Sequence, residues 1–455
     1  MPPSDRKNRI FIGPEPGNTI KLAIIGMPNT GKSSLFNALV APPLHKMQPV
    51  SDFCFTTLGI SRGEFPIEDK RLDWYQKIFG AKRAIGFTSI VADGPALVRG
   101  SHAGNGEGMQ FMEQYRDCDV YLHVLRGWDD AQLTHWEETV NPVRDAEIVT
   151  QELLMADLVK LENRILELYK EHDSLVYNHQ PVGKNHKWEK WTLLRAWHWI
   201  VGRDRTEHPF KANVRKHDPM PDKCEGWALR LGEWDDMEIE ILQKYKFFTA
   251  KPVVYVLNIP VREHTRLRAE WLEKIKVALT KIELGANTGY GYIVPMSLAL
   301  ENRLAQKRRE GLLTHYLEAN PSHLSLIPDL NMLIARSLDL ITFYTGKTPL
   351  STPGFIEFVP EPNDNDVCAW RCRQGKNAQD AAALINTEVS RYYNRLTMYS
   401  ESDLRDENGD FDKLIEFGKN RMQQKKYEMN DGDIVEFFAF DVPPDVVEKP
   451  PTKKR

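Results

Sequence analysis

The sequence predicts an α/β protein: a parallel sheet with crossover helices, a helical insertion within it and a small mixed domain after it. Strand-like apolar runs alternate with helical stretches from residue 21 to 128, and the strand pattern returns at 252–257 and 292–295. Such alternation is typical of βαβ units. Between these parts lies a long stretch with helical spacing of its apolar residues, which predicts helices in place of strands.

Six parts are expected along the 455 residues, one of them in two stretches, because the texture of the sequence changes along the chain. The sheet domain is formed by two stretches that flank the insertion. The predicted limits are a lead-in at 1–19, the sheet domain at 20–128 and 250–310, a helical or coiled-coil insertion at 129–249, a connector at 311–338, a small α+β domain at 339–440 and a basic tail at 441–455. The insertion has apolar residues spaced by three, four and seven, namely Ile148, Leu153, Leu154, Leu158, Leu161, Ile165 and Leu168.

Composition narrows the class of protein. The net charge of −4 provides no overall attraction to nucleic acid or membrane. Five scattered cysteines, an odd number, argue against a disulfide framework. The first twenty residues contain no apolar run long enough for a signal peptide or membrane anchor. A cytoplasmic protein without a membrane partner is therefore expected.

Residues 26–33 read GMPNTGKS, the phosphate-binding loop (P-loop) pattern. The strand-like run 21–25 precedes them and a helical stretch, 34–40, follows, which is the context that the motif requires. Glycines let backbone amides approach phosphates at the start of a helix, where the helix dipole favours anions. Lys32 would reach the outer phosphates and Ser33 would ligate Mg²⁺. The predicted nucleotide-binding residues of this loop are Asn29, Thr30, Gly31, Lys32, Ser33 and Ser34.

Two further residues fit the Mg²⁺ side of a site that hydrolyses nucleotides. Thr57 follows Lys32 by 25 residues. It would complete the Mg²⁺ shell, or it forms an ordinary pair of strand threonines with Thr56. Asp93 follows the apolar run 87–92 and would hold Mg²⁺ through water at a strand's carboxyl end, or it belongs to a surface turn.

The sequence also offers a candidate residue for reading the base and a candidate loop for sensing the terminal phosphate. Asn258 ends the apolar run 253–257, and its amide would read a base edge, or it is a turn asparagine. The stretch 100–108 contains four glycines. This composition suits a mobile loop that becomes ordered on the terminal phosphate, or an exposed linker.

Several separate motifs, in chain order, resemble those of the Obg-like ATPase (YchF) family. Besides the P-loop they are FCFTT at 53–57, LVRGSHAGNGEG at 97–108, YLHVLR at 121–126 and NPVRDAEI at 141–148. The resemblance covers about 20–440, with divergence in the insertion. It implies that 339–440, with its closing DGDI, is a TGS domain. The resemblance also implies that the protein is a switch that hydrolyses MgATP slowly. It further implies a cytoplasmic monomer that is linked to ribosomes and to translation or assembly factors. RNA would be contacted through the insertion and the TGS domain.

The base-side residues favour ATP over GTP. The family belongs to the GTPase superclass but prefers ATP, and guanine-specific relatives use an Asn-Lys-x-Asp loop. Residues 258–261 read NIPV, and Val261 cannot accept hydrogen bonds from a guanine ring. An unpaired buried donor is costly, so tight GTP binding is disfavoured. The resemblance implies that Asn258 and Ile259 hold the base and that Ser297 lies in the last base-side loop.

The residue that would act in hydrolysis is not an obvious glutamine, and His123 is the candidate. Leu97 stands where other relatives place a water-orienting Gln. His123 matches a family histidine proposed to act in hydrolysis, or it is a packed strand residue. By resemblance, Asn29 matches an asparagine that helps to hold a monovalent cation in some related NTPases.

One departure from the family pattern leaves two functions open, an active ATPase and a nucleotide-binding protein with impaired hydrolysis. The family reads Asp-x-x-Gly where residues 93–96 read DGPA. The Cβ of Ala96 restricts the backbone, and Pro95 has no amide hydrogen and restricts Gly94. The sequence therefore predicts an ATPase whose ligands include Mg²⁺ at Ser33, Thr57 and Asp93. The alternative is a hydrolysis-impaired nucleotide-binding structural or assembly factor in a larger complex.

Overall fold

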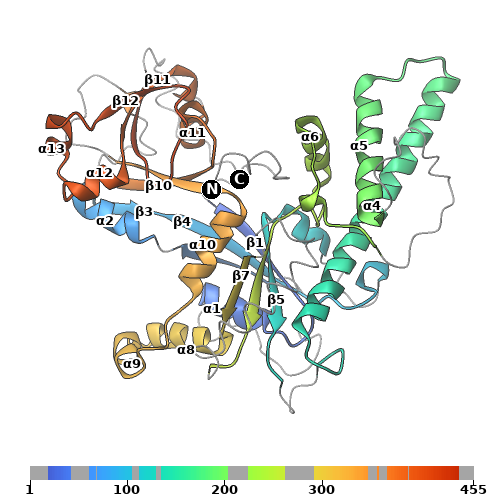
Figure 1. Cartoon of the computed structure of the whole chain (residues 1–455), viewed down its shortest axis with the longest axis horizontal. Coiled ribbons are helices and arrows are strands. Elements are labelled where there is room, and N and C mark those ends of the chain that lie inside the picture. Colours follow the sequence, from blue (N-terminus) through green and yellow to red (C-terminus); the bar gives the residue numbers. More distant parts are fainter. Residues whose placement is uncertain are drawn as a thin grey trace. The chain divides into compact units, whose positions relative to one another are not determined.

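A computed structural model describes residues 19–41, 61–67, 69–104, 112–129, 135–202, 224–261, 292–346, 356–357, 366–387 and 389–439 (Figure 1). The chain divides into two compact units, each described here by itself. The first unit takes in Lys21–Phe65 and Ile90–Ser337. The second takes in Pro66–Ser89 and the chain from Leu338 onward. The predicted lead-in up to residue 18, Thr57 and the predicted tail at 441–455 lie outside the described residues.

A largely parallel sheet forms the centre of the first unit. In the described part of the chain its strand order is β2-β4-β1-β5-β6-β7, and the pairs β1–β5, β5–β6 and β6–β7 are parallel. All residues of β5 and β6 are buried, which explains their apolar sequences. The predicted α/β fold is thus confirmed. The strands are β1 (Thr19–Ile25), β2 (Ser61–Ile67), β4 (Phe87–Asp93), β5 (Val120–Arg126), β6 (Val253–Asn258) and β7 (Tyr292–Met296).

Helices cover the sheet on both faces. In one set of helices, α1 packs against α8, and α10 packs against strands β6 and β7. The first part of α4 covers other sheet residues, since Val149 and Leu153 share a core cluster with Ile25, Tyr121 and Tyr255. These elements are α1 (Lys32–Val40), η3 (Ser101–Ala103), η4 (Glu113–Asp117), α4 (Pro142–Tyr177), α8 (Leu298–Arg309), α9 (Leu313–Ala319) and α10 (Ile327–Ser337).

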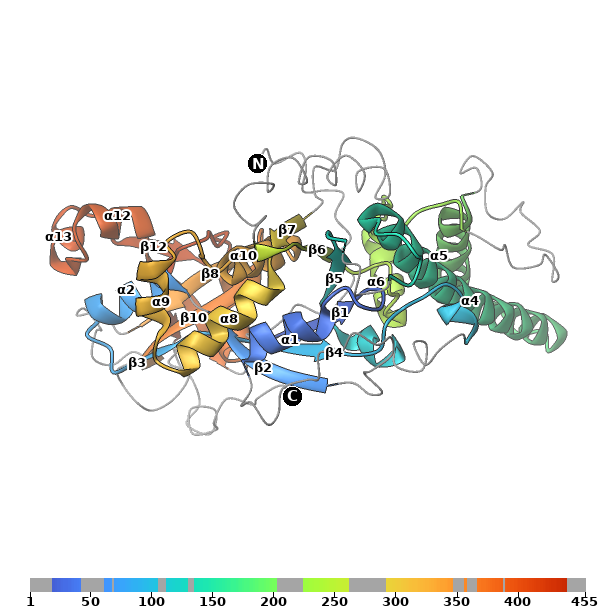
Figure 2. The same cartoon turned by 90° about the horizontal axis from the view of Figure 1, so that it is seen from below.

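The predicted helical insertion contains α4, α5 (Lys184–Val201), η5 (Leu229–Leu231) and α6 (Asp236–Tyr245). Helices α4 and α5 lie side by side in both views (Figures 1 and 2). All seven apolar residues that predicted the helix are buried in α4. Beyond Ala156 they pack with tryptophans of the insertion, including Trp197, Trp199 and Trp234. Because α4 is one continuous helix of 36 residues, it belongs to the sheet core at its start and to the insertion core further on.

The second unit is a mixed sheet. Its order among the described residues is β12-β11-β13-β8-β10-β3, and β9 pairs with β13. Helix α11 shares a core with Phe343, Leu396 and Phe437. Its elements are α2 (Lys70–Ile78), β3 (Arg83–Ile85), β8 (Leu340–Thr345), β9 (Ile356–Glu357), β10 (Asp366–Arg373), α11 (Ala378–Ile385), η7 (Val389–Tyr392), β11 (Tyr393–Tyr399), α12 (Glu401–Asp406), α13 (Phe411–Glu416), β12 (Arg421–Gln424) and β13 (Ile434–Ala439).

An early segment of the chain completes this second unit. Strand β3 pairs in parallel with β10, where Arg83 bonds Asp366 through two nitrogens. In α2, Tyr75 packs on Tyr344 with ring centroids 4.4 Å apart. Arg71 of the same helix forms a 2.8 Å ion pair with Asp431. The predicted limits counted α2 and β3 with the sheet domain, whereas they pack with the C-terminal strands.

Candidate nucleotide-binding site

The P-loop joins β1 to α1, at the point where the strand order reverses. In open α/β sheets, ligands bind at the carboxyl ends of the strands at such a point. Gly26 and Gly31 have φ angles of 149° and 103°, and Gly31 caps α1. A Cβ on Gly31 would lie 2.5 Å from Nδ2 of Asn258. Both glycines are therefore required by backbone conformation and by space, and the amides at the start of α1 can face an anion.

Replacing Gly31 by alanine is expected to weaken MgATP binding about tenfold or more, because a strained φ and the contact with Asn258 act together. Titration of a fluorescent ATP analogue measures the change. Gly311→Ala is the matched control, since Gly311 has a φ of 71° and nothing within 4 Å of the added Cβ. If Gly31→Ala binds MgATP as tightly as the wild type does, then the backbone conformation at position 31 does not require glycine for nucleotide binding.

Lys32, Ser33 and Asp93 lie close together at the P-loop. Lys32 is 9% exposed, and its Nζ donates to the Met27 carbonyl at 2.8 Å. The Ser33 hydroxyl donates to Oδ2 of Asp93 at 2.7 Å. Asp93 is fully buried, which raises the pKa of its carboxyl, while Lys32 and the Ser33 bond act in the opposite direction. The hydroxyl and the carboxylate therefore lie side by side at the start of α1.

These oxygens fit a magnesium ion. Mg²⁺ prefers oxygen ligands and is commonly held by one or two carboxylates with waters and substrate phosphates. Oδ1 of Asp93 is buried without a hydrogen-bond partner among the described residues. A cation or its water would satisfy that atom. The predicted third ligand, Thr57, lies outside the described residues.

The remaining loop residues have local structural roles. Asn29 has a φ of 58°, in the left-handed region. The buried Thr30 hydroxyl donates to the Met27 carbonyl at 3.1 Å. The Ser34 carbonyl accepts a 2.8 Å hydrogen bond from Asn302 of α8. These contacts hold the loop between β1 and α8.

The stretch after Asp93 is packed where it is described. Residues 94–98 are buried, and the Leu97 amide donates to the Gly26 carbonyl at 3.1 Å. Ala96 is not among the described residues with positive φ, so its Cβ causes no backbone strain in this conformation. Of the glycine stretch 100–108, the structure describes residues 100–104, in which Ser101 is buried and Ala103 and Gly104 are exposed. Gly106 and Gly108 of the predicted mobile loop lie outside the described residues.

Of the residues predicted to border the base, Asn258 contacts the P-loop directly. Asn258 donates through Nδ2 to the Thr30 carbonyl at 3.0 Å and accepts at Oδ1 from the Leu298 amide at 3.2 Å. Ser297 is the N-cap of α8. Ile259 is buried and Val261 is half-buried. Asn258 therefore joins the P-loop to the start of α8, so its amide fixes the position of both.

His123 lies in the centre of β5, beside Ile25 of β1 in the strand register. Its ring centroid is 5.3 Å from that of Tyr255. Burial lowers the pKa of His123 to about 3, so the imidazole is neutral at physiological pH. Nε2 has no hydrogen-bond partner among the described residues. The buried ring is therefore a weak base, and its Nε2 can form a hydrogen bond with a group brought next to it.

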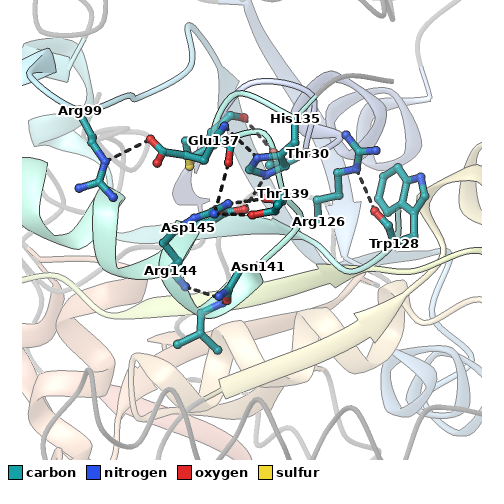
Figure 3. A network of polar contacts seen from close by, with 12 residues as sticks. Thr30, Arg99, Arg126, Trp128, His135, Glu137, Thr139, Asn141, Arg144 and Asp145 are labelled. Atoms are coloured by element: carbon teal, nitrogen blue, oxygen red, sulfur yellow. Dashed lines mark hydrogen bonds and ion pairs between the residues drawn. The ribbon is translucent and has the colours of Figure 1, made fainter. Parts of the chain in front are cut away.

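The motif at 141–148 starts α4. Asn141 caps the helix, and its Oδ1 accepts from the Val143 and Arg144 amides. Figure 3 shows the surrounding network, in which the buried His135 ring lies 2.8 Å from Asp145 and Arg99 bonds Glu137 at 3.1 Å. This network fastens the segment before α4 to the stretch that follows Asp93.

Comparison with known proteins agrees with this site. A family model described as "50S ribosome-binding GTPase" matches residues 21–156, and the model for the YchF GTPase C-terminal domain, described as "Protein of unknown function (DUF933)", matches residues 362–440. Obg-like ATPase 1 of Bos taurus is 30% identical over 97% of this chain and 98% of its own length. This chain belongs to the Obg-like ATPase family. Obg-like ATPase 1 of Homo sapiens is 29% identical over the same shares.

The fold of this Obg-like ATPase family member is that of a solved relative. The YchF GTPase of Schizosaccharomyces pombe matches 94% of this chain and 100% of its own chain, with a TM-score of 0.66 and 24% identity. The family assignment makes the chain a nucleotide-binding P-loop protein. No helix in the described ranges is both long and apolar enough to cross a bilayer.

Sequence reasoning missed two buried acids of α4. Glu152 accepts hydrogen bonds from the Gly100 and His102 amides, and Asp157 accepts them from the Phe248 and Thr249 amides. A signal was present, because Glu152 lies at helical spacing from Val149 on the apolar side of the helix. A charged residue within an apolar stripe indicates a buried polar contact.

Proposed function

We propose that this chain binds MgATP and hydrolyses it slowly, as a nucleotide-dependent switch. The observation that supports the proposal is the grouping of Lys32, Ser33 and Asp93 at the start of α1, beside the P-loop. Phosphoryl transfer depends mainly on positioning and on charge stabilisation, which this grouping supplies. Ser33, Asp93 and Thr57 would hold Mg²⁺. The ion would neutralise charge on the phosphates.

ATP is the proposed nucleotide because the base side offers no acceptor for guanine at Val261, which is half-buried. Asn258 and Ile259 would border the base, and Ser297 would position the last base-side loop through the start of α8. Asn29, Thr30, Gly31 and Ser34 would contact phosphates through the loop backbone. GTP is expected to bind more weakly, since a buried unpaired donor is costly.

His123 would act in hydrolysis as a neutral imidazole. Because burial lowers the pKa of His123 to about 3, the imidazole is uncharged and a weak base at neutral pH, so it would act through a hydrogen bond of the neutral ring and not as a proton acceptor. Its place beside Ile25, directly before the P-loop, supports a role near the phosphates.

The second candidate function is a nucleotide-binding factor with little turnover. The sequence at 93–96 favours it, since Pro95 offers no amide hydrogen and Ala96 replaces a flexible glycine. In this reading the chain would serve in assembly of a larger complex, and ATP would stabilise its fold.

The partners proposed for the chain follow the family. The matching family model is described as a 50S ribosome-binding GTPase, which supports a link to ribosomes and to translation or assembly factors. We assign a TGS domain to 339–440, the insertion to 129–249 and RNA contact to both. A cytoplasmic monomer is the proposed state. Cosedimentation of the purified chain with ribosomal subunits in ATP and in ADP tests the ribosomal link.

Single-turnover hydrolysis separates the two candidate functions. Wild type is expected to bind ATP more tightly than GTP and to turn over slowly. Ala96→Gly, which restores flexibility beside the P-loop, is expected to raise the rate several-fold with an unchanged ATP dissociation constant. Absent turnover in wild type with gained turnover in Ala96→Gly would establish the second candidate. Tighter binding of GTP would contradict the base assignment, for which Val261→Asp is the positive control.

A further inference from the structure

One buried carboxylate holds the turn that follows the Asp93 stretch. Glu152 of α4 is 5% exposed. Its Oε1 accepts from the Gly100 amide at 2.8 Å, and its Oε2 accepts from the His102 amide at 2.9 Å. Oε2 also lies 2.7 Å from Nδ1 of His102. Three groups of one turn thus meet a single carboxylate. Charge-assisted hydrogen bonds of this kind are stronger than neutral ones.

The same turn is continuous with the segment that touches the P-loop. The Val98 amide donates to the buried Ser101 hydroxyl at 2.9 Å, and the Leu97 amide donates to the Gly26 carbonyl. Only Arg99 separates Val98 from Gly100. Displacement of the turn would therefore displace the buried segment 94–98 against the phosphate site.

Glu152 also occupies a joining position within α4. Val149 and Leu153, on either side of it, belong to the sheet core, whereas Leu158 and Leu161 belong to the insertion core. The helix runs without a break through both. A force applied at Glu152 therefore acts on a helix that reaches into the insertion.

A further side-chain link in the described part of the chain joins this stretch to the segment before α4, and it lies at the surface. Arg99, whose side chain is 61% exposed, pairs with Glu137. Solvent-exposed ion pairs contribute little. Among the described contacts of the turn, the buried bonds to Glu152 therefore carry most of the restraint.

We propose that Glu152 is a positioning residue for ATP hydrolysis. By holding the turn at 100–102 it keeps the Asp93–Leu97 segment in place against the P-loop, and it transmits displacement of that segment to α4. The proposal rests on the proposed function, since it concerns the same site. Glu152 itself contacts neither phosphate nor Mg²⁺.

Glu152→Gln tests the proposal, because the amide nitrogen of glutamine is a donor and cannot accept both sets of N–H groups. We expect the MgATP dissociation constant to stay within about threefold, while the single-turnover rate falls about 10- to 100-fold through misplacement of the segment. Amide hydrogen exchange at Gly100 and His102 should accelerate. Glu147→Gln, at an exposed position on the same helix, is the matched control, and it should change neither the single-turnover rate nor the amide exchange at Gly100 and His102.

Graded variants distinguish positioning from folding. Glu152→Asp keeps the charge and should recover part of the rate. His102→Ala removes one bond but keeps both amide bonds, so it should give a smaller decrease, and it provides the test if Glu152→Gln does not fold. An unchanged rate in both Glu152→Gln and His102→Ala, or a loss of ATP binding in proportion to rate, would overturn the proposal.

Hydrogen exchange of the wild type separates this proposal from the proposed function. The amides at 100 and 102 and those of α4 near Glu152 should exchange at different rates in MgATP and in MgADP. Identical exchange overturns the positioning role, whatever the turnover. Altered exchange without turnover supports the positioning role and contradicts only the proposed hydrolysis.

Discussion

Replacing Lys32 by alanine is expected to weaken MgATP binding about 10- to 100-fold and to reduce single-turnover hydrolysis below detection. Lys32 is the first residue of α1, and its Nζ reaches the Met27 carbonyl within the P-loop. Its charge therefore lies inside the cradle that would surround the phosphates. A hydrogen bond to a charged group contributes about 1.5–3 kcal/mol, and 1.4 kcal/mol corresponds to tenfold in affinity.

Calorimetric titration with ATP in excess Mg²⁺ measures this loss. Lys77→Ala is the matched control, since Lys77 is an exposed helical lysine of α2. Circular dichroism of both variants checks that the fold is retained. ATP binding by Lys32→Ala at wild-type strength would mean that the P-loop does not bind the phosphates, and both candidate functions would then fail.

Replacing Asp157 by alanine is expected to lower the free energy of unfolding of the first unit by about 3–5 kcal/mol, because the buried donors that it accepts from lose their acceptor at about 1–3 kcal/mol each. Asp157 is fully buried. Its oxygens accept from the Phe248 and Thr249 amides at 2.9 and 2.7 Å and lie 3.4 Å from Arg116. Removing it leaves two buried amides and the Thr249 hydroxyl without their acceptor, whereas Arg116 keeps its 2.6 Å ion pair with Glu113. This carboxylate thereby joins α4 to the chain segment that leads into β6.

Urea unfolding followed by tryptophan fluorescence measures the effect, because Trp197, Trp199 and Trp234 lie in the insertion core of the same unit. Asp173→Ala, at an exposed position of α4, is the matched control and should stay within about 0.5 kcal/mol. A loss below about 1 kcal/mol in Asp157→Ala would show that water replaces the carboxylate at little cost.

Local sequence patterns were sufficient for the sheet, the P-loop and α4. Apolar runs predicted β1, β5 and β6, and the spacing of leucines predicted α4, because these signals depend on neighbours along the chain. Ser33 and Asp93 were each picked out as Mg²⁺ candidates from local patterns, a motif and a strand end, whereas the direct hydrogen bond between them is known only from the structure.

Contacts between distant segments could not be read in the same way. Glu152 lies 50 residues from His102, and no local pattern states which turn a buried acid will meet. Asn258 was expected to face a base, yet the structure has its amide bonded to Thr30 and Leu298. Such side chains satisfy backbone groups brought near by the fold, so their partners are known only once the topology is known.

Because α2 and β3 pack with the C-terminal strands, the second unit is encoded by two separate stretches of the gene. A gene fragment that starts at Leu338 would encode β10 without its neighbour β3, and Tyr344 without the Tyr75 ring that covers it. The second unit could not be transferred to another protein by simple fusion at one end. Recombination that preserves it must carry both stretches of the gene, so the two units are expected to be inherited together.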